Sequence, residues 1–132
     1  MSNDETILPV PVIILEDELI IQNRLRRILT DLGYENETLH FVFNLKEAFE
    51  KIEEIPISLA LVDLGLPDGN GVEFIEKLRE RDSSALILVI SAWSTQSSLF
   101  SAIKAGATGY VLKERDDLEI TFSIRSILRG GA

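Results

Sequence analysis

The sequence predicts an α/β fold in which one parallel sheet is covered by helices on both faces. Five short apolar runs lie along the chain, and an amphipathic segment with helical spacing follows each of them. This strict alternation is typical of parallel sheets, because a crossover helix must return the chain before the next parallel strand. The runs are apolar on both faces and rich in β-branched residues, as strands covered on both sides require.

Each expected element occupies a definite range of the sequence. The strands are expected at 10–15, 38–43, 58–62, 85–90 and 109–112, of which the second is the weakest. The helices are expected at 19–32, 45–52, 72–78, 99–105 and 118–128, where apolar residues recur at helical spacing. Glycine or proline then ends four of the five helices, at Gly33, Pro56, Gly106 and Gly130.

Length and composition exclude several classes of protein. The chain has 132 residues and a formal net charge of −9, which fits one domain. This charge argues against direct binding of nucleic acid or of an anionic membrane, because both need clustered Lys and Arg. The absence of cysteine excludes disulfides, zinc–thiolate sites and cysteine nucleophiles. A single histidine cannot supply a His-rich metal site.

The chain carries no recognisable targeting segment. Its N-terminus is polar and acidic, unlike a signal peptide, and no apolar run is long enough to span a membrane. We therefore expect residues 1–8 to form a flexible tail and residues 9–132 to form one domain in the cytoplasm.

Five polar side chains stand where the expected strands end, which is where parallel sheets bind ligands. They are Glu16, Asp17, Asp63, Ser91 and Lys113. Taken singly, each has an ordinary structural explanation. An aspartate can cap a helix or open a polar turn, a serine hydroxyl can satisfy a nearby backbone group, and a lysine can be solvated.

Their convergence at one edge favours a functional site. Glu16, Asp17 and Asp63 would repel one another there, and one carboxyl group would be driven towards protonation. A bound divalent cation removes this conflict. Mg²⁺ suits the set, because it takes few carboxylates and shares phosphate oxygens.

Four segments together resemble the receiver domain of two-component response regulators. They are Leu-Glu-Asp-Glu at 15–18, Val-Asp-Leu-Gly-Leu-Pro-Asp-Gly-Asn-Gly at 62–71, Ser-Ala at 91–92 and Ala-Gly-Ala-Thr-Gly-Tyr-Val-Leu-Lys at 105–113. The last segment and the Arg-Gly-Gly ending are most similar to the NarL/FixJ (LuxR-type) branch. The resemblance implies a flavodoxin-like (βα)5 receiver fold with strand order 2-1-3-4-5. It also implies a helix-turn-helix effector domain after the receiver, which is absent from this chain.

The resemblance implies that Asp63 accepts a phosphoryl group from a sensor histidine kinase. A carboxylate is already ionised at neutral pH, so this nucleophile needs no general base. The resemblance further implies that Mg²⁺, or Mn²⁺ in its place, is held by Glu16, Asp17, Asp63 and the backbone carbonyl of Gly65. The domain would be a phosphoacceptor and not an enzyme, assisting only its own phosphorylation and dephosphorylation.

The resemblance also assigns residues to phosphoryl contact and to switching. Lys113, Ser91 and the backbone amide of Ala92 would contact phosphoryl oxygens. Ser91 and Tyr110 would act as the switch, changing the face formed by the fourth helix, the fifth strand and the fifth helix. The expected results are homodimerisation on phosphorylation and, through the missing C-terminal domain, DNA binding and control of transcription.

The chain departs from the receiver pattern at three places. Glu114 follows Lys113 where many receivers have a proline, and we expect a trans peptide bond there because a cis bond before a non-proline residue costs about 2.5–4 kcal/mol. Gly65 offers no side chain to shield the phosphoryl group, whereas Trp93 is large and close to the site. We expect Gly65 and Trp93 to control access of water to the pocket.

Other functions fit these residues less well. A phosphohydrolase of the haloacid dehalogenase type needs a second aspartate where Gly65 stands. A flavodoxin-like electron carrier needs a phosphate loop where residues 16–18 are acidic, and no P-loop motif is present. The remaining alternative is a receiver-like interaction module that is not phosphorylated.

Overall fold

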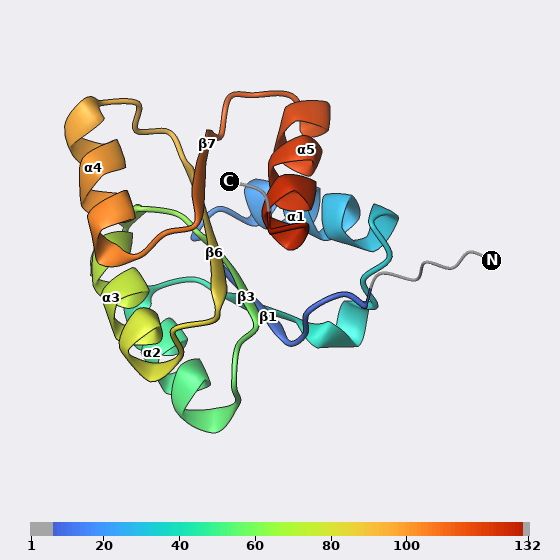
Figure 1. The fold of residues 1–132 in the computed structure, drawn as a ribbon, viewed down its shortest axis with the longest axis horizontal. Coiled ribbons are helices and arrows are strands. Elements are labelled where there is room, and N and C mark those ends of the chain that lie inside the picture. The colour runs from blue at the N-terminus through green and yellow to red at the C-terminus, as the bar shows by residue number, and fades with distance from the viewer. Residues whose placement is uncertain (1–6, 131–132) are drawn as a thin grey trace.

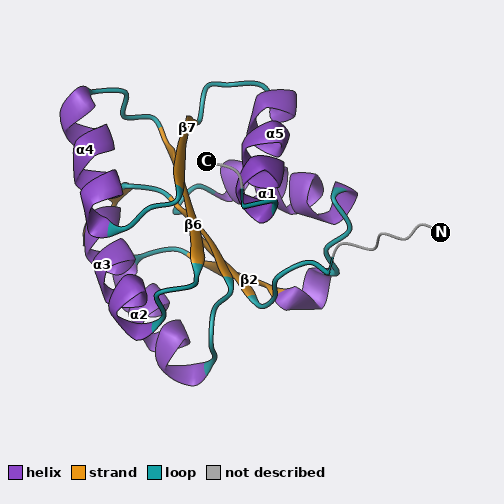
Figure 2. Ribbon diagram, in the orientation of Figure 1, coloured by secondary structure: helices purple, strands orange, loops and turns teal. Residues whose placement is uncertain are grey.

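The computed structural model describes residues 7–130, which form a parallel sheet between two layers of helices (Figures 1 and 2). The five strands of the sheet are β1 (Val12–Leu15), β2 (Leu39–Val42), β3 (Leu59–Val62), β6 (Leu86–Ser91) and β7 (Gly109–Leu112). Their order is β2-β1-β3-β6-β7, and every neighbouring pair is parallel. The predicted fold class and strand order are confirmed.

The helices cover the two faces of the sheet unequally. On one face lie α2 (Leu45–Glu54), α3 (Gly71–Arg81) and α4 (Gln96–Ala105), and on the other lie α1 (Leu19–Asp31) and α5 (Asp117–Leu128) (Figure 1). Alternate residues of β1 enter the two cores. Ile13 packs with the cluster of α2 and α3, whereas Ile14 packs with that of α1 and α5. Both faces of the central strands are therefore apolar, as the uninterrupted runs predict.

Two short elements were not predicted. One is a 3-10 turn, η1 (Asn36–Thr38), and the other is an antiparallel hairpin of β4 (Gly65–Leu66) and β5 (Gly69–Asn70). Strands of two residues are too short to show an alternating pattern. The hairpin is held by Asp68, whose carboxylate accepts hydrogen bonds from the amides of Leu45 (2.9 Å) and Lys46 (3.1 Å) at the start of α2.

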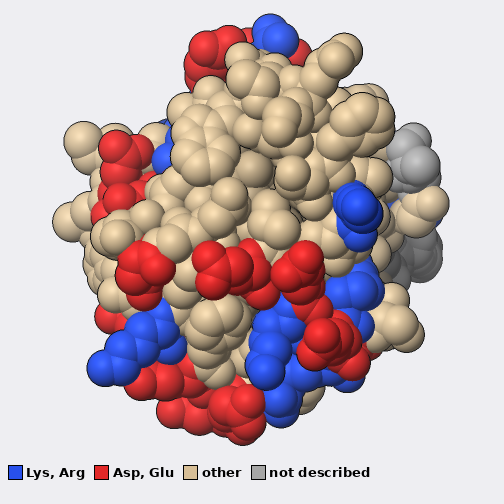
Figure 3. Space-filling model, turned by 90° about the vertical axis from the view of Figure 1, so that its left-hand side faces the viewer, with Lys and Arg blue, Asp and Glu red and all other residues tan. Residues whose placement is uncertain are grey.

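Helix α4 forms where its apolar spacing predicts, but it buries little of that apolar surface. Of its residues only Ala102 is buried, whereas Leu99, Phe100 and Ile103 are exposed, Phe100 to 74%. Figure 3 shows a largely uncharged upper surface on this side of the molecule, above a region crowded with acidic and basic side chains. The amphipathic pattern of α4 therefore supplies more exposed apolar surface than core.

The N-terminal prediction falls mostly outside the described residues, which begin at residue 7. Leu8 packs against the core of α1 and α5, and the Tyr34 hydroxyl donates a hydrogen bond to the Pro9 carbonyl (3.0 Å). No helix within residues 7–130 has the length and apolarity needed to cross a membrane.

Gly71 packs closely against the backbone of Asp63, which directly follows β3. A Cβ atom at this first residue of α3 would lie 2.2 Å from the carbonyl oxygen of Asp63. We expect Gly71→Ala to lower the free energy of unfolding by about 3 kcal/mol, because overpacking against backbone outweighs the gain in helix propensity. Urea denaturation measures this change.

Gly109→Ala is the matched control for that substitution. A Cβ there would lie 3.1 Å from Cδ1 of Leu88 and 3.3 Å from Cγ2 of Ile127, and these side-chain atoms need to move by only a few tenths of an ångström. We expect a clearly smaller loss of stability. An equal loss in both variants would show that the contact with the Asp63 carbonyl has no special weight.

Candidate functional site

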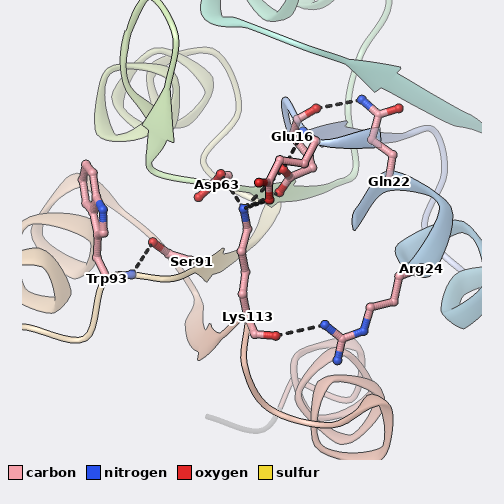
Figure 4. A network of polar contacts seen from close by, with 8 residues as sticks. Glu16, Gln22, Arg24, Asp63, Ser91, Trp93 and Lys113 are labelled. Carbon is pink, nitrogen blue, oxygen red and sulfur yellow. Dashed lines mark hydrogen bonds and ion pairs between the residues drawn. The ribbon is translucent and has the colours of Figure 1, made fainter. Parts of the chain in front are cut away.

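Two of the predicted carboxylates, Glu16 and Asp63, meet at the ammonium group of Lys113, at the carboxyl ends of the strands (Figure 4). Lys113, directly after β7, places its Nζ 2.9 Å from Oδ2 of Asp63 and 3.0 Å from Oε1 of Glu16. Asp17 joins the group, because Glu16, Asp17 and Asp63 each present an oxygen within 4.8 Å of the others. The carboxyl ends of the parallel strands thus bring together residues up to 97 positions apart in the sequence.

The site is buried on one side and open on the other. Glu16 and Asp63 are only 1% and 5% exposed, whereas Asp17 is exposed. Glu18 adds an exposed carboxylate 3.4 Å from the Lys113 ammonium. One lysine therefore pairs with three carboxyl groups, two of them removed from water, and Asp17 adds a fourth carboxyl group beside them.

Burial sets the protonation of these groups. Burial raises the pKa of Glu16 from 4.5 to about 7, against the hydrogen bonds from the Glu18 amide and Lys113 that favour its ionised form. Burial likewise raises the pKa of Asp63. For Lys113 burial opposes the charged form, but hydrogen bonds to Asp63 and Glu16 outweigh it and raise the pKa. The lysine stays charged, but its single positive charge does not balance the negative charge of the carboxyl groups around it.

A divalent cation fits this deficit. The available donors are all oxygen atoms, and the closely spaced carboxylates suit a hard cation such as Mg²⁺ or Mn²⁺. The half-buried Gly65, two residues after Asp63, begins strand β4 of the hairpin that follows this pocket. The Gly65 amide also favours the ionised form of Asp63 and so opposes the rise in its pKa.

Helix α1 supports the acidic loop through contacts that the sequence analysis missed. Gln22 is buried, and its side-chain amide donates a hydrogen bond to the backbone carbonyl of Glu16 (2.7 Å). The Glu16 carboxylate in turn accepts a hydrogen bond from the amide of Glu18 (2.9 Å). A glutamine within the buried stripe of a helix was the one available signal, because buried amides need partners.

Ser91 and Trp93 form a second group beside the carboxylates. Ser91 is fully buried at the end of β6, and its hydroxyl accepts a hydrogen bond from the amide of Trp93 (3.0 Å; Figure 4). The Trp93 indole lies against Gly65, since a Cβ on that glycine would be 3.0 Å from Cζ2 of the ring. The Tyr110 hydroxyl donates to the Trp93 carbonyl (2.7 Å), while Ala92 is exposed.

The Lys113–Glu114 peptide bond is trans, as expected. Within the described chain only the Val10–Pro11 bond is cis. Lys113 thus reaches the pocket without a proline after it.

The raised pKa of Glu16 predicts a pH-dependent stability. Its folded pKa, about 7, lies above the unfolded value of 4.5, so its contribution to stability is present at low pH and lost as the pH rises through 7. We expect the free energy of unfolding of the wild type to fall, relative to Glu16→Gln, between about pH 5 and about pH 8. Urea denaturation at several pH values, without divalent cations, measures the difference.

Glu18→Gln is the control for this pH dependence, because it removes an exposed carboxylate from the same lysine. We expect its stability to follow that of the wild type with pH. A constant difference between wild type and Glu16→Gln at all pH values would contradict the raised pKa.

Known proteins match this chain over nearly its whole length. The sequence profile of the response regulator receiver domain matches residues 12–125. The chemotaxis protein CheY of Thermotoga maritima is 33% identical over 102 residues, covering 77% of this chain and 83% of CheY. The nitrate/nitrite response regulator protein NarL of Escherichia coli is 26% identical and covers 98% of this chain. This chain spans 58% of the length of NarL.

Solved structures agree with the sequence matches. A two-component response regulator of the LuxR family from Aurantimonas has a TM-score of 0.78 at 25% identity, covering 93% of this chain and 87% of that one. This neighbour and NarL bear out the resemblance to the NarL/LuxR-type branch. The chain belongs to the family of response regulator receiver domains.

Proposed function

We propose that Asp63 accepts a phosphoryl group from a phosphohistidine of a sensor kinase in the cytoplasm. The observation that carries this proposal is a buried aspartate held 2.9 Å from a lysine ammonium, in a pocket with two further carboxylates. An Asp63 oxygen attacks phosphorus and the phosphorus–nitrogen bond breaks. The bonding electron pair passes to the imidazole, and an acyl phosphate forms. Catalysis then depends on alignment and charge neutralisation.

The donor set for a metal ion is the one described above. Glu16, Asp17, Asp63 and the backbone carbonyl of Gly65 would hold Mg²⁺ or Mn²⁺. When bound, the ion supplies positive charge that offsets the carboxylates and the entering phosphoryl oxygens. The Lys113 ammonium, freed in part from Asp63, pairs with a phosphoryl oxygen as a point charge. The domain acts as a phosphoacceptor and turns over no other substrate.

Phosphorylation would change the contacts of Ser91. In the structure the Ser91 hydroxyl oxygen accepts a hydrogen bond from the Trp93 amide. A phosphoryl oxygen on Asp63 would offer the proton of that hydroxyl a charged acceptor. The Ala92 amide, in the same loop, donates to a further oxygen. Because Tyr110 is bonded to the Trp93 carbonyl, movement of this loop reaches β7.

This switch would change the face made by α4, β7 and α5. The exposed apolar side chains of α4 give that face a surface suited to protein contact. We expect phosphorylation to favour a homodimer and to control an attached DNA-binding domain. The similarity to KdpE of Escherichia coli, the KDP operon transcriptional regulatory protein, supports a role in transcription, and this chain spans only about half of its length.

Direct phosphorylation tests the proposed function. With Mg²⁺ and a small phosphodonor of the phosphoramidate class, we expect intact-mass spectrometry to show one added phosphoryl group on the wild type. Asp63→Asn should show none, and Asp17→Asn or chelation of the metal should slow the reaction strongly. The phosphoryl group should map to the peptide containing Asp63.

Asp68→Asn is the matched control, because Asp68 lies in the same loop but its carboxylate caps α2. We expect it to be phosphorylated like the wild type. If the wild type gains no mass, the chain is instead an interaction module that is not phosphorylated.

The indole of Trp93 is expected to shield the acyl phosphate from water. It covers Gly65, where the chain offers no side chain of its own. We expect Trp93→Ala to lose its phosphoryl group severalfold faster than the wild type, measured by following the phosphorylated mass with time. Phe100→Ala, an exposed aromatic on α4, should leave the rate unchanged. An unchanged rate in Trp93→Ala would contradict shielding.

A further inference from the structure

Arg24 joins helix α1 to the loop that carries Lys113. Its guanidinium donates hydrogen bonds from Nη1 to the Lys113 carbonyl (2.9 Å), from Nη2 to the Arg115 carbonyl and from Nε to Oδ1 of Asp117 (2.6 Å). Figure 4 shows this side chain reaching the Lys113 carbonyl. A single planar group thus binds three points between β7 and α5.

These contacts hold the backbone of Lys113 in addition to its hydrogen bond with the sheet. The Lys113 amide donates to the Ser91 carbonyl (2.9 Å), so the amide is held by β6 while the carbonyl is held by Arg24. The rigid fork of a guanidinium can bind several acceptors at once with defined geometry. The peptide units on both sides of Lys113 are therefore anchored.

Anchoring matters because lysine is a flexible side chain. Holding its four-carbon stem in one conformation costs entropy, and a mobile backbone would add to that cost. The Nζ must reach Asp63, which follows β3, from β7, which is separated from β3 by β6. Small backbone displacements at Lys113 would therefore carry its ammonium out of range of the acceptor carboxylate.

Arg27 provides a comparison within the same helix. It lies three residues after Arg24 and also pairs with Asp117, at 3.3 Å. Its side chain is 62% exposed, against 20% for Arg24. Within the described residues it donates no hydrogen bond to the backbone of residues 113–115. The two arginines thus share charge, helix and acidic partner but differ in contact with that loop.

We propose that Arg24 is a positioning residue, which holds the backbone of Lys113 so that its ammonium meets the phosphoryl group on Asp63. This inference rests on the proposed phosphorylation of Asp63. Arg24 touches neither Asp63 nor the carboxylate cluster and acts only through Lys113.

Phosphorylation of Arg24→Gln and Arg27→Gln by the small phosphodonor tests the proposal. We expect Arg24→Gln to be phosphorylated about ten- to a hundredfold more slowly, as misplacement of a catalytic group typically costs. Arg27→Gln should react like the wild type. The rise in melting temperature produced by Mg²⁺ should be the same in all three proteins, because the carboxylates are untouched. Equal rates in the two variants would overturn the proposal.

A double substitution separates positioning from general weakening of the fold. In a Lys113→Ala background, Arg24→Gln should cause no further loss of rate, because the group it positions is absent. Loss of the same factor in both backgrounds would overturn the proposal. If Arg24→Gln does not fold, Arg24→Lys, which keeps the charge but not the fork, should fold and show an intermediate rate.

The NMR resonance of the Lys113 Nζ gives a reading that does not depend on phosphorylation. We expect it to shift in Arg24→Gln and not in Arg27→Gln. A shifted resonance in a protein whose wild type cannot be phosphorylated would place the failure in the proposed function. An unshifted resonance would place it in the positioning role.

Discussion

The contact of one lysine ammonium with two buried carboxylates is the interaction on which the rest of the site depends. Lys113 lies within 3.0 Å of oxygens from both Glu16 and Asp63, which are almost wholly withdrawn from water. Without it, two buried negative charges would face each other uncompensated. The strand order makes the contact possible. Strands β1 and β3 are adjacent, and only β6 lies between β3 and β7. A long side chain such as lysine can cross the end of β6.

The surrounding loops are fixed by contacts that leave little freedom near this charge cluster. Gly71 starts α3 so close to the Asp63 carbonyl that a side chain would collide with it. Asp68 ties the following hairpin to the start of α2, and Gln22 ties the Glu16 carbonyl to α1. The contacts of Asp68 and Gln22 each join a side chain to backbone elsewhere in the chain. The carboxylates are therefore positioned by their supporting residues as much as by the strands.

The sequence predicted what depends on periodicity and chain order, and it missed what depends on single long-range contacts. The five strands and five main helices followed from apolar spacing, and the meeting of Glu16, Asp17, Asp63 and Lys113 followed from the strand-end rule. The hairpin after Asp63, the amide of Gln22 and the fork of Arg24 were missed, because such contacts leave no repeating pattern. The exposure of α4 was missed because amphipathic spacing does not show which apolar positions a neighbouring element covers.

The two loops that border the site differ in how firmly they are held. This difference indicates which of the two would move when a group binds at the site. On the β7–α5 side, three hydrogen bonds from Arg24 anchor the chain to α1. On the β6–α4 side, residues 92–95 are exposed and lead into a helix that buries only Ala102. Segments with few buried contacts move at the lowest free-energy cost. Under the proposed function, a phosphoryl group on Asp63 would therefore pull the Trp93 loop towards a fixed Lys113, and α4 would follow.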